Sequence, residues 1–223
     1  MTDDVKPEIS SIYRDLKVKI IGGTIVPGTA LVEGSLATEY QVSRSPIREA
    51  LSRLTFEGLV ERHDRALRVR VLRPEEVLEL YEVRIALEAA AARAAAQRRT
   101  DLDLARLQRT VEAMKELGPK DTEQRAKMAH ATHFVIWAAS HNKALVDTLE
   151  GVHQLVMGLA STTLHYEDRW NTFLGECEEL LDAIRAQDVD VAGEIAARQM
   201  TNARDFRVRL YSANIDETDE PFL

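Results

Sequence analysis

The sequence predicts a mainly α-helical protein, with an N-terminal winged helix-turn-helix carrying a small β wing and a C-terminal all-α antiparallel helical bundle. The first observation is a short helix, a tight turn and a second helix between residues 35 and 56, followed by two short strands. The second is the Ala- and Leu-rich chain after Pro74, where apolar residues recur at helical spacing. The length of 223 residues allows two domains, which we place at residues 1–72 and 73–223.

The charges are divided unevenly between these two parts. Residues 1–73 carry 12 Lys and Arg against 10 Asp and Glu, whereas residues 74–223 carry 17 against 27, and the whole chain has a net charge of −8. Eight arginines fall within residues 44–73, against four acidic residues. An acidic chain with a locally basic N-terminal part is compatible with nucleic-acid binding, because only the charge near the docking surface matters there.

Residues 42–54 predict a helix with a well-defined start and one apolar side. Ile47, Leu51 and Leu54 fall at positions i, i+4 and i+7, which places them on a single stripe that can face a core. Pro46 suits the first turn of this helix, because no backbone donor is missed there. The residues off the stripe can therefore face outward.

Arginine and serine side chains mark the outward side of this helix. Arg44 stands at the helix start, and Arg48 and Arg53 lie off the apolar stripe. Such arginines can enter a major groove and pair with guanine edges or phosphates. Ser43 and Ser45 can cap the helix or donate to phosphate. A plain solvated face is the alternative, but the position on the second helix of a helix-turn-helix favours DNA contact.

Two short strands are expected next, at residues 59–63 and 67–71, because apolar residues alternate there. The polar tip between them, residues 64–66, would make the pair a wing. Arg65 and Arg68 can reach a minor groove or the DNA backbone, or they serve only solubility. The candidate DNA contacts are therefore Ser43, Arg44, Ser45, Arg48, Arg53, Arg65 and Arg68.

Helix start and stop signals divide the rest of the chain. In the N-terminal part, helices are expected at residues 12–21, after a cap at Ser10 or Ser11, and at residues 35–40. Thr100 is a further expected cap, and either Asp121 or Thr122 is expected to cap the helix after it. Six helices are expected in the bundle, at residues 74–98, 101–117, 122–140, 143–166, 167–186 and 189–211. The acidic residues from about 212 to 223 are expected to form a disordered tail.

The chain from 12 to 60 resembles the GntR family of transcription regulators. The residues that carry the resemblance are Tyr13, Leu16, Lys17, Ile20, Gly23, Pro27-Gly28, Leu31, Glu33, Leu36-Ala37, residues 42–51, Arg53-Leu54 and residues 57–60. Most of 74–206 is similar to the FCD-type effector domain of the FadR subfamily, on residues 80–84, Leu87-Glu88, His133, Ala139-Ser140, Asn142, Ala183-Ile184, Asp188 and Ala192. The resemblance implies a homodimer that binds a short palindromic operator and releases it when a small metabolite, usually a carboxylic acid, enters the bundle.

The resemblance also points to a metal position, which this chain departs from. Many such bundles hold a metal with one Asp and three His, and the corresponding positions here are Ala129, His133, Cys177 and Gln199. Cysteine can ligate zinc, but alanine cannot and glutamine is a poor ligand. We therefore predict a bundle without a metal or other cofactor. The wing departs too, since Ala66 stands where the family has a tip glycine.

The candidate effector-binding residues are chosen from helical spacing and from the positions that correspond to the family's metal ligands. Arg84 either forms an internal ion pair with Glu88 at i+4 or takes an effector carboxylate in bidentate fashion. His133 is either an interior histidine with its hydrogen bonds made inside the protein, or a hydrogen-bond donor that lines the effector cavity of the bundle. Cys177, expected as an inert packed thiol rather than a nucleophile, shares that cavity by correspondence. The full set of candidates is Arg84, His133, Cys177, Gln199 and Asn202.

Composition also bounds the class of protein. A single cysteine excludes an internal disulfide, and no apolar run approaches the roughly 20 residues of a membrane span. We expect a soluble, cytoplasmic protein without membrane contact. We interpret the chain as a metabolite-responsive, dimeric DNA-binding regulator, a repressor and not an enzyme, that binds double-stranded operator DNA. The alternative is a helical-bundle metalloenzyme with an appended DNA-binding module, which requires bound metal and turnover.

Overall fold

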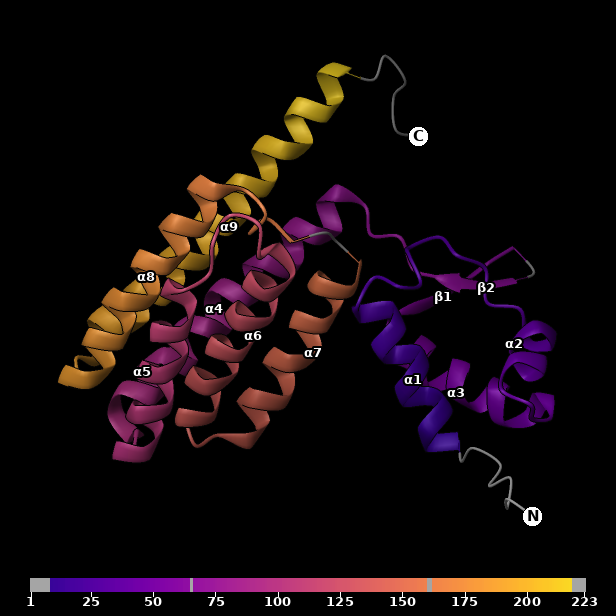
Figure 1. Ribbon diagram of the computed structural model, residues 1–223, viewed down its shortest axis with the longest axis horizontal. Coiled ribbons are helices and arrows are strands. Elements are labelled where there is room, and N and C mark those ends of the chain that lie inside the picture. The colour runs from indigo at the N-terminus through magenta and orange to yellow at the C-terminus, as the bar shows by residue number, and fades with distance from the viewer. Residues whose placement is uncertain (1–8, 65, 160–161, 218–223) are drawn as a thin grey trace. The chain divides into compact units, whose positions relative to one another are not determined.

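The computed structural model describes residues 9–64, 66–159 and 162–217, and Figure 1 shows the path of the chain. These residues form nine helices and a two-stranded antiparallel sheet. The chain divides into two compact units. The N-terminal unit comprises Met1–Arg73 with Gln154–Ser161, and the bundle unit comprises Pro74–His153 with Thr162–Leu223. Each unit is described by itself below.

The N-terminal unit is a helix-turn-helix followed by a β-hairpin, as predicted. Its elements are α1 (Ile9–Ile21), α2 (Glu33–Glu39), α3 (Arg44–Phe56), β1 (Val60–His63) and β2 (Ala66–Val69). The first helix begins earlier than expected, so Ser10 and Ser11 lie inside α1 instead of capping it. The predicted stripe of α3 is confirmed, because Ile47, Leu51 and Leu54 are fully buried and pack in one apolar core with residues of α1. This core fixes α3 and leaves its other side exposed.

The hairpin turn is built without the tip glycine that the resemblance implied. Val60 pairs with Val69, and at the tip His63 pairs with Ala66, so Ala66 belongs to the strand. Asp64 adopts a left-handed backbone with φ of 52°. Aspartate tolerates this conformation better than most non-glycine residues, because its short polar side chain can hydrogen-bond locally.

The bundle unit contains six helices, as predicted. They are α4 (Pro74–Arg98), α5 (Asp101–Lys115), α6 (Thr122–Ala139), α7 (Lys143–Leu159), α8 (Glu167–Ala186) and α9 (Val189–Glu217), and of α7 only the part up to His153 is counted in this unit. Two expected ends are wrong: α7 ends before residue 166, and Ser212–Glu217 continues α9 instead of beginning a disordered tail. Neither Gly nor Pro interrupts this stretch before Pro221, so nothing local stops the helix. The remainder of the expected tail, residues 218–223, lies outside the described residues.

Helix α4 is the centre of the bundle and packs against α6, α8 and α9 (Figure 1). Its Ala91, Ala92, Ala95 and Ala96 have no exposed surface, so these small side chains let neighbouring helices pack closely against α4. Gly193 of α9 has the same use, since a Cβ there would stand 2.6 Å from the guanidinium carbon of Arg93. Among the described residues, none of the helices combines the length and apolar character that crossing a membrane requires.

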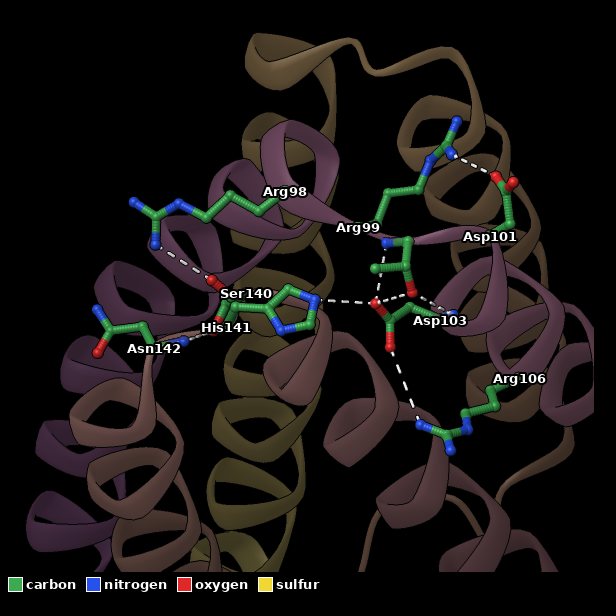
Figure 2. Close-up of polar contacts among 9 residues, drawn as sticks. Arg98, Arg99, Asp101, Asp103, Arg106, Ser140, His141 and Asn142 are labelled. Carbon is green, nitrogen blue, oxygen red and sulfur yellow. Dashed lines mark hydrogen bonds and ion pairs between the residues drawn. The ribbon is translucent and has the colours of Figure 1, made fainter.

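One end of the bundle is fixed by a network centred on Asp103 (Figure 2). Thr100 caps α5 as predicted, and its hydroxyl accepts from the Asp103 N–H at 3.2 Å while Asp103 Oδ2 accepts from the Thr100 N–H at 2.9 Å. His141, which follows α6, lies 2.9 Å from the same carboxylate oxygen. Arg98 and Arg99, at the end of α4, donate to last-turn carbonyls: Arg98 to Ser140, and Arg99 to Ile184 and Arg185. Carbonyls that the helices leave free are thus satisfied.

Candidate functional site

The start of α3 presents the predicted serine and arginine side chains to solvent. Ser43, Arg44 and Ser45 are all exposed. Ser43 occupies the N-cap position with extended backbone, but its side chain makes no capping hydrogen bond, so its expected capping role is wrong. Gly34 of α2 lies beside the Arg44 side chain, since a Cβ built there would be in ordinary van der Waals contact with an Arg44 Nη atom, at 3.6 Å. These polar groups remain available to an external partner.

Arg48 is held by a carboxylate from the preceding helix. Its Nε and Nη2 donate to the two carboxylate oxygens of Glu33, the first residue of α2, at 3.2 and 3.0 Å. The Arg48 side chain is still 69% exposed, whereas that of Glu33 is 31% exposed. Hydrogen bonding from Arg48 lowers the pKa of the Glu33 carboxyl, and the positive charges of Arg44 and Arg62 lower it further. Arg48 therefore binds this carboxylate directly, and the charges of two further arginines act on it.

The remaining candidate DNA contacts are paired within the unit. Arg53 donates to Glu49, one turn earlier on α3, at 2.7 Å. Arg68 of β2 stands opposite Glu61 of β1 and donates to it at 2.8 Å. Arg65 lies outside the described residues. Arg62, an exposed residue of β1, was missed by the sequence analysis, although it belongs to the same basic stretch.

The bundle contains a buried polar cluster around Glu88. We call it the Glu88 cluster; it comprises Arg84 and Glu88 of α4, His130, His133 and Trp137 of α6, and His153 of α7. Glu88 accepts from Arg84 Nη2 at 2.8 Å and from Trp137 Nε1 at 2.6 Å, and His133 Nδ1 lies 3.5 Å from it. The i, i+4 ion pair expected between Arg84 and Glu88 is present and fully buried.

Protonation in this cluster is set by burial and by the charges around it. Burial acts to raise the pKa of Glu88, but His133, Arg84 and the Trp137 N–H outweigh it, so that its pKa lies far below the usual range. The rings of His130 and His153 stack at 4.2 Å. Burial lowers the pKa of both, and the neighbouring His133 acts in the same direction at His130, as does the positive charge of Arg84 at His153. The cluster therefore holds an ionised carboxylate beside two neutral imidazoles.

A second buried polar cluster joins α8 to α9. We call it the Glu176 cluster; it comprises Arg169, Glu176 and Cys177 of α8 with Gln199 and Asn202 of α9. Glu176 accepts from Asn202 at 2.5 Å and lies 3.5 Å from Arg169, whose other Nη donates to the Gln199 carbonyl at 3.3 Å. Gln199 Nε2 donates to Cys177 Sγ at 3.4 Å. Burial raises the pKa of the Cys177 thiol to about 12, which fits the expected inert thiol.

The predicted effector residues thus divide between the two clusters, with Arg84 and His133 in one and Cys177, Gln199 and Asn202 in the other. The Phe173 ring lies between the clusters, 5.6 Å from the His133 ring and 5.8 Å from the Arg169 guanidinium carbon. The Nε atoms of Arg84 and Arg169 are buried without a hydrogen-bond partner among the described residues. Both clusters therefore keep an unused cationic donor.

An open groove between α8 and α9 reaches the second cluster. It has a volume of about 250 Å³ and is lined by Asp168, Arg169, Thr172, Asn202, Asp205, Phe206 and Arg209. Arg169 is only 4% exposed. The groove therefore offers a small solvated molecule a way to a buried guanidinium.

The residues at the family's metal position do not fit a metal. Ala129 offers no ligand atom, and the Cys177 thiol is protonated and accepts a hydrogen bond from Gln199. His133 has its Nδ1 toward Glu88 rather than toward these residues. Across the described parts of the chain, no three His, Cys, Asp or Glu side chains are grouped as metal ligands. The absence of a cofactor remains a prediction.

The sequence analysis assigned no role to Trp137, Arg169 or Glu176, and it did not predict the stacking of His130 on His153. Arg169 had a local signal, because it stands directly before Trp170 and four residues before Phe173, two aromatic residues that are both buried. Glu176 falls on the same face at i+7. The stacking of His130 on His153 joins two helices and has no local signal.

Comparisons with known proteins agree with both halves of this description. Residues 8–69 match the family described as bacterial regulatory proteins, gntR family, and residues 79–202 match the FCD domain family. The chain is 30% identical to the HTH-type transcriptional regulator LutR of Bacillus subtilis over 220 residues, covering 88% of this chain and 99% of LutR.

Other relatives and a solved structure are consistent with this. The chain is 38% identical to the gluconate operon transcriptional repressor of B. subtilis over 77 residues (34% of this chain, 32% of the repressor). It is 29% identical to the Glc operon transcriptional activator of Escherichia coli K12 over 177 residues (70% of each chain). The solved structure of E. coli McbR/YncC has the same fold, with a TM-score of 0.75 at 24% identity, covering 91% of this chain and 98% of that one.

Proposed function

This chain belongs to the GntR family of bacterial regulatory proteins and carries an FCD domain, and from that premise we propose that it is a repressor released from a palindromic operator by a small carboxylic acid. It is a DNA-binding transcription regulator and not an enzyme, so the metalloenzyme alternative falls away. The observation that supports the proposal best is the contrast between exposed arginines on α3 and unused buried guanidinium donors in the bundle.

In the proposed DNA complex, α3 enters the major groove with Arg44 and Arg48 as readers of bases or phosphates. Ser43 and Ser45 donate to phosphate, and Arg53, Arg65 and Arg68 extend the contact along the backbone. Two copies bind as a homodimer, so that two copies of α3 read two half-sites about 10 base pairs apart. With about six phosphates neutralised per dimer, the logarithm of affinity falls against the logarithm of salt with a slope of about −5.

The proposed effector is an anion that reaches the Glu176 cluster through the groove between α8 and α9. Its carboxylate accepts a hydrogen bond from the unpaired Nε of Arg169 and replaces the 3.5 Å contact between Arg169 and Glu176. A guanidinium favours such a ligand because it can pair with both carboxylate oxygens. Gln199 and Asn202 can donate to the same ligand, and Cys177 lines its apolar side. Arg84 and His133 can hold a second polar group of a larger effector.

Release from DNA follows from differential affinity. The two DNA-binding units of the dimer have one arrangement that fits the operator and another that does not. The effector must bind the second arrangement more tightly than the first. A coupling of about 1–3 kcal/mol is typical, which weakens operator binding by about 5- to 150-fold.

The DNA half of the proposal is tested by selection from random duplexes with the purified full-length protein. An enriched inverted repeat supports it, whereas no enrichment over input DNA at moderate salt contradicts it. Placing the selected site in a promoter then tests the sign of regulation, since a repressor lowers reporter output and an activator raises it.

The effector half is tested by thermal-shift screening of carboxylic acids, aromatic ones included, against the full chain. A ligand at 100 times its dissociation constant stabilises its protein by about 2.7 kcal/mol. An acid that stabilises the wild type should also release operator DNA. It should neither stabilise the Arg169→Lys variant nor release DNA from it, because lysine keeps the positive charge but lacks the planar guanidinium that binds a carboxylate in bidentate fashion. Arg106→Lys, on the exposed face of α5, is the matched control. A stabilising acid that still binds Arg169→Lys normally would contradict the assignment.

A further inference from the structure

We propose that Glu33 is a specificity-determining positioning residue, which holds the Arg48 guanidinium in place and suppresses binding of that arginine to phosphates of unrelated DNA. The proposal rests on the proposed role of Arg48 as a DNA reader.

The first argument is geometric. Glu33 bonds two nitrogens of Arg48, at 3.2 and 3.0 Å, and these atoms belong to side chains 15 residues apart on α2 and α3. A bidentate pair fixes the plane of the guanidinium as well as its position. Nη1 takes no part in this pair, so one edge of the group stays available to a base.

The second argument concerns stability. An ion pair this exposed, with 69% of the arginine side chain accessible, contributes little to folding. Glu33 is also an acidic residue in the middle of a basic face, where Arg44 and Arg62 act on it as well. A carboxylate at this place weakens the attraction between the basic residues and DNA phosphates. That attraction supplies essentially all non-specific DNA affinity. Neither folding stability nor non-specific DNA affinity accounts for an acidic residue at position 33, whereas discrimination between the operator and unrelated DNA does.

The third argument is a contrast with Arg53. That arginine is paired with Glu49 one turn earlier on its own helix, an arrangement that surface helices make routinely. The Glu33 pair instead crosses the turn of the helix-turn-helix, so it couples the orientation of Arg48 to α2. Substitution of Glu49 therefore provides a control with the same change of charge in the same part of the N-terminal unit.

The experiment compares Glu33→Gln with Glu49→Gln in the full-length protein. Affinities for the selected operator and for a random duplex of equal length are measured by fluorescence anisotropy over a salt series. For Glu33→Gln we expect the random duplex to bind about 3- to 10-fold tighter, with a salt slope steeper by about 1–2, while the ratio of operator to random affinity falls by about tenfold. Glu49→Gln should leave that ratio within about twofold of wild type.

A second variant separates charge from position. Glu33→Asp keeps the negative charge but is one methylene shorter, so it should keep weak random binding and still lose operator affinity. Equal effects of Glu33→Gln and Glu49→Gln, or an unchanged affinity ratio in Glu33→Gln, would overturn the proposal. An Arg48→Ala variant that binds its operator normally would instead overturn the DNA-reading role itself, so the two failures are distinguishable. Thermal unfolding of each variant verifies that it is folded.

Discussion

The two units of this protein place their charges in opposite ways. Every buried polar or charged side chain among the described residues lies in the bundle unit, between Arg84 and Arg207. The buried residues of the N-terminal unit, in contrast, are all apolar, and its arginines and glutamates stay at the surface. The N-terminal unit thus keeps charges where an ion pair can be exchanged for a DNA contact at little cost.

Buried charges in the bundle have a different meaning. Well-packed apolar residues of the same volume often stabilise a protein more than a buried ion pair does. The Arg84–Glu88 and Arg169–Glu176 pairs are therefore poor devices for stability alone, and both leave guanidinium nitrogen unpaired. The effector binding proposed above gives these pairs a use. Because they are buried, the bundle is the unit in which the loss of a single charged partner should cost most.

The largest expected effect comes from Glu88→Gln. This isosteric change leaves the buried Arg84 without its counter-charge, and loss of one partner of a buried pair costs about 3–5 kcal/mol. Urea denaturation followed by tryptophan fluorescence measures it, because both tryptophans, Trp137 and Trp170, lie in the bundle. Glu123→Gln removes an exposed i, i+4 partner of Lys127 and should change stability by less than about 0.5 kcal/mol. Similar losses in both variants would remove the contrast between buried and exposed pairs.

The next effect belongs to the N-terminal unit and concerns DNA binding rather than folding. Arg48→Ala should weaken operator binding by about 100-fold or more, since each arginine that reads a base contributes about 1–3 kcal/mol and the proposed homodimer carries two. Its thermal unfolding should stay that of the wild type, because Arg48 is exposed. Arg14→Ala, an equal charge change on the exposed side of α1, should bind normally. Operator affinity of Arg48→Ala within a few-fold of wild type would contradict the assignment.

A smaller effect should appear when the pH is lowered. The pKa values of His130 and His153 lie below 6.5 in the folded protein, so the unfolded chain takes up protons from about pH 6.5 downward while the folded chain does not. Their contribution to stability is fully present above pH 6.5 and is lost as the pH falls, by up to about 1.4 kcal/mol per pH unit for each histidine.

Urea denaturation at about pH 7.5, 6.5 and 5.5 measures this loss, over the range in which histidine changes charge. His153→Phe should flatten the pH dependence, whereas His165→Gln, a change at an exposed histidine of the same unit, should not. A slope unaffected by His153→Phe would show that the stacked pair is not the source.

What the sequence could reveal follows from how local each feature is. The apolar stripe of α3, the Thr100 cap and the start of α4 at Pro74 depend on residues within one or two turns, and all were predicted. The pairing of Glu33 with Arg48 and the stacking of His130 on His153 depend on tertiary packing between helices, so spacing alone did not reveal them. The division of effector candidates between two clusters has the same cause.

The smallest effect compares one cap in each unit. Thr100 makes the side-chain hydrogen bonds of a capping box, whereas the Ser43 side chain makes no capping bond, although both were expected to cap. Thr100→Ala should therefore destabilise the bundle by about 1 kcal/mol. Ser43→Ala should leave the stability of the N-terminal unit unchanged and weaken operator binding a few-fold, by loss of one solvent-exposed hydrogen bond from a hydroxyl to phosphate per copy. Thermal unfolding and anisotropy on both variants measure these effects. A Ser43→Ala variant that loses stability but not affinity would return that serine to a capping role and remove it from the DNA contact.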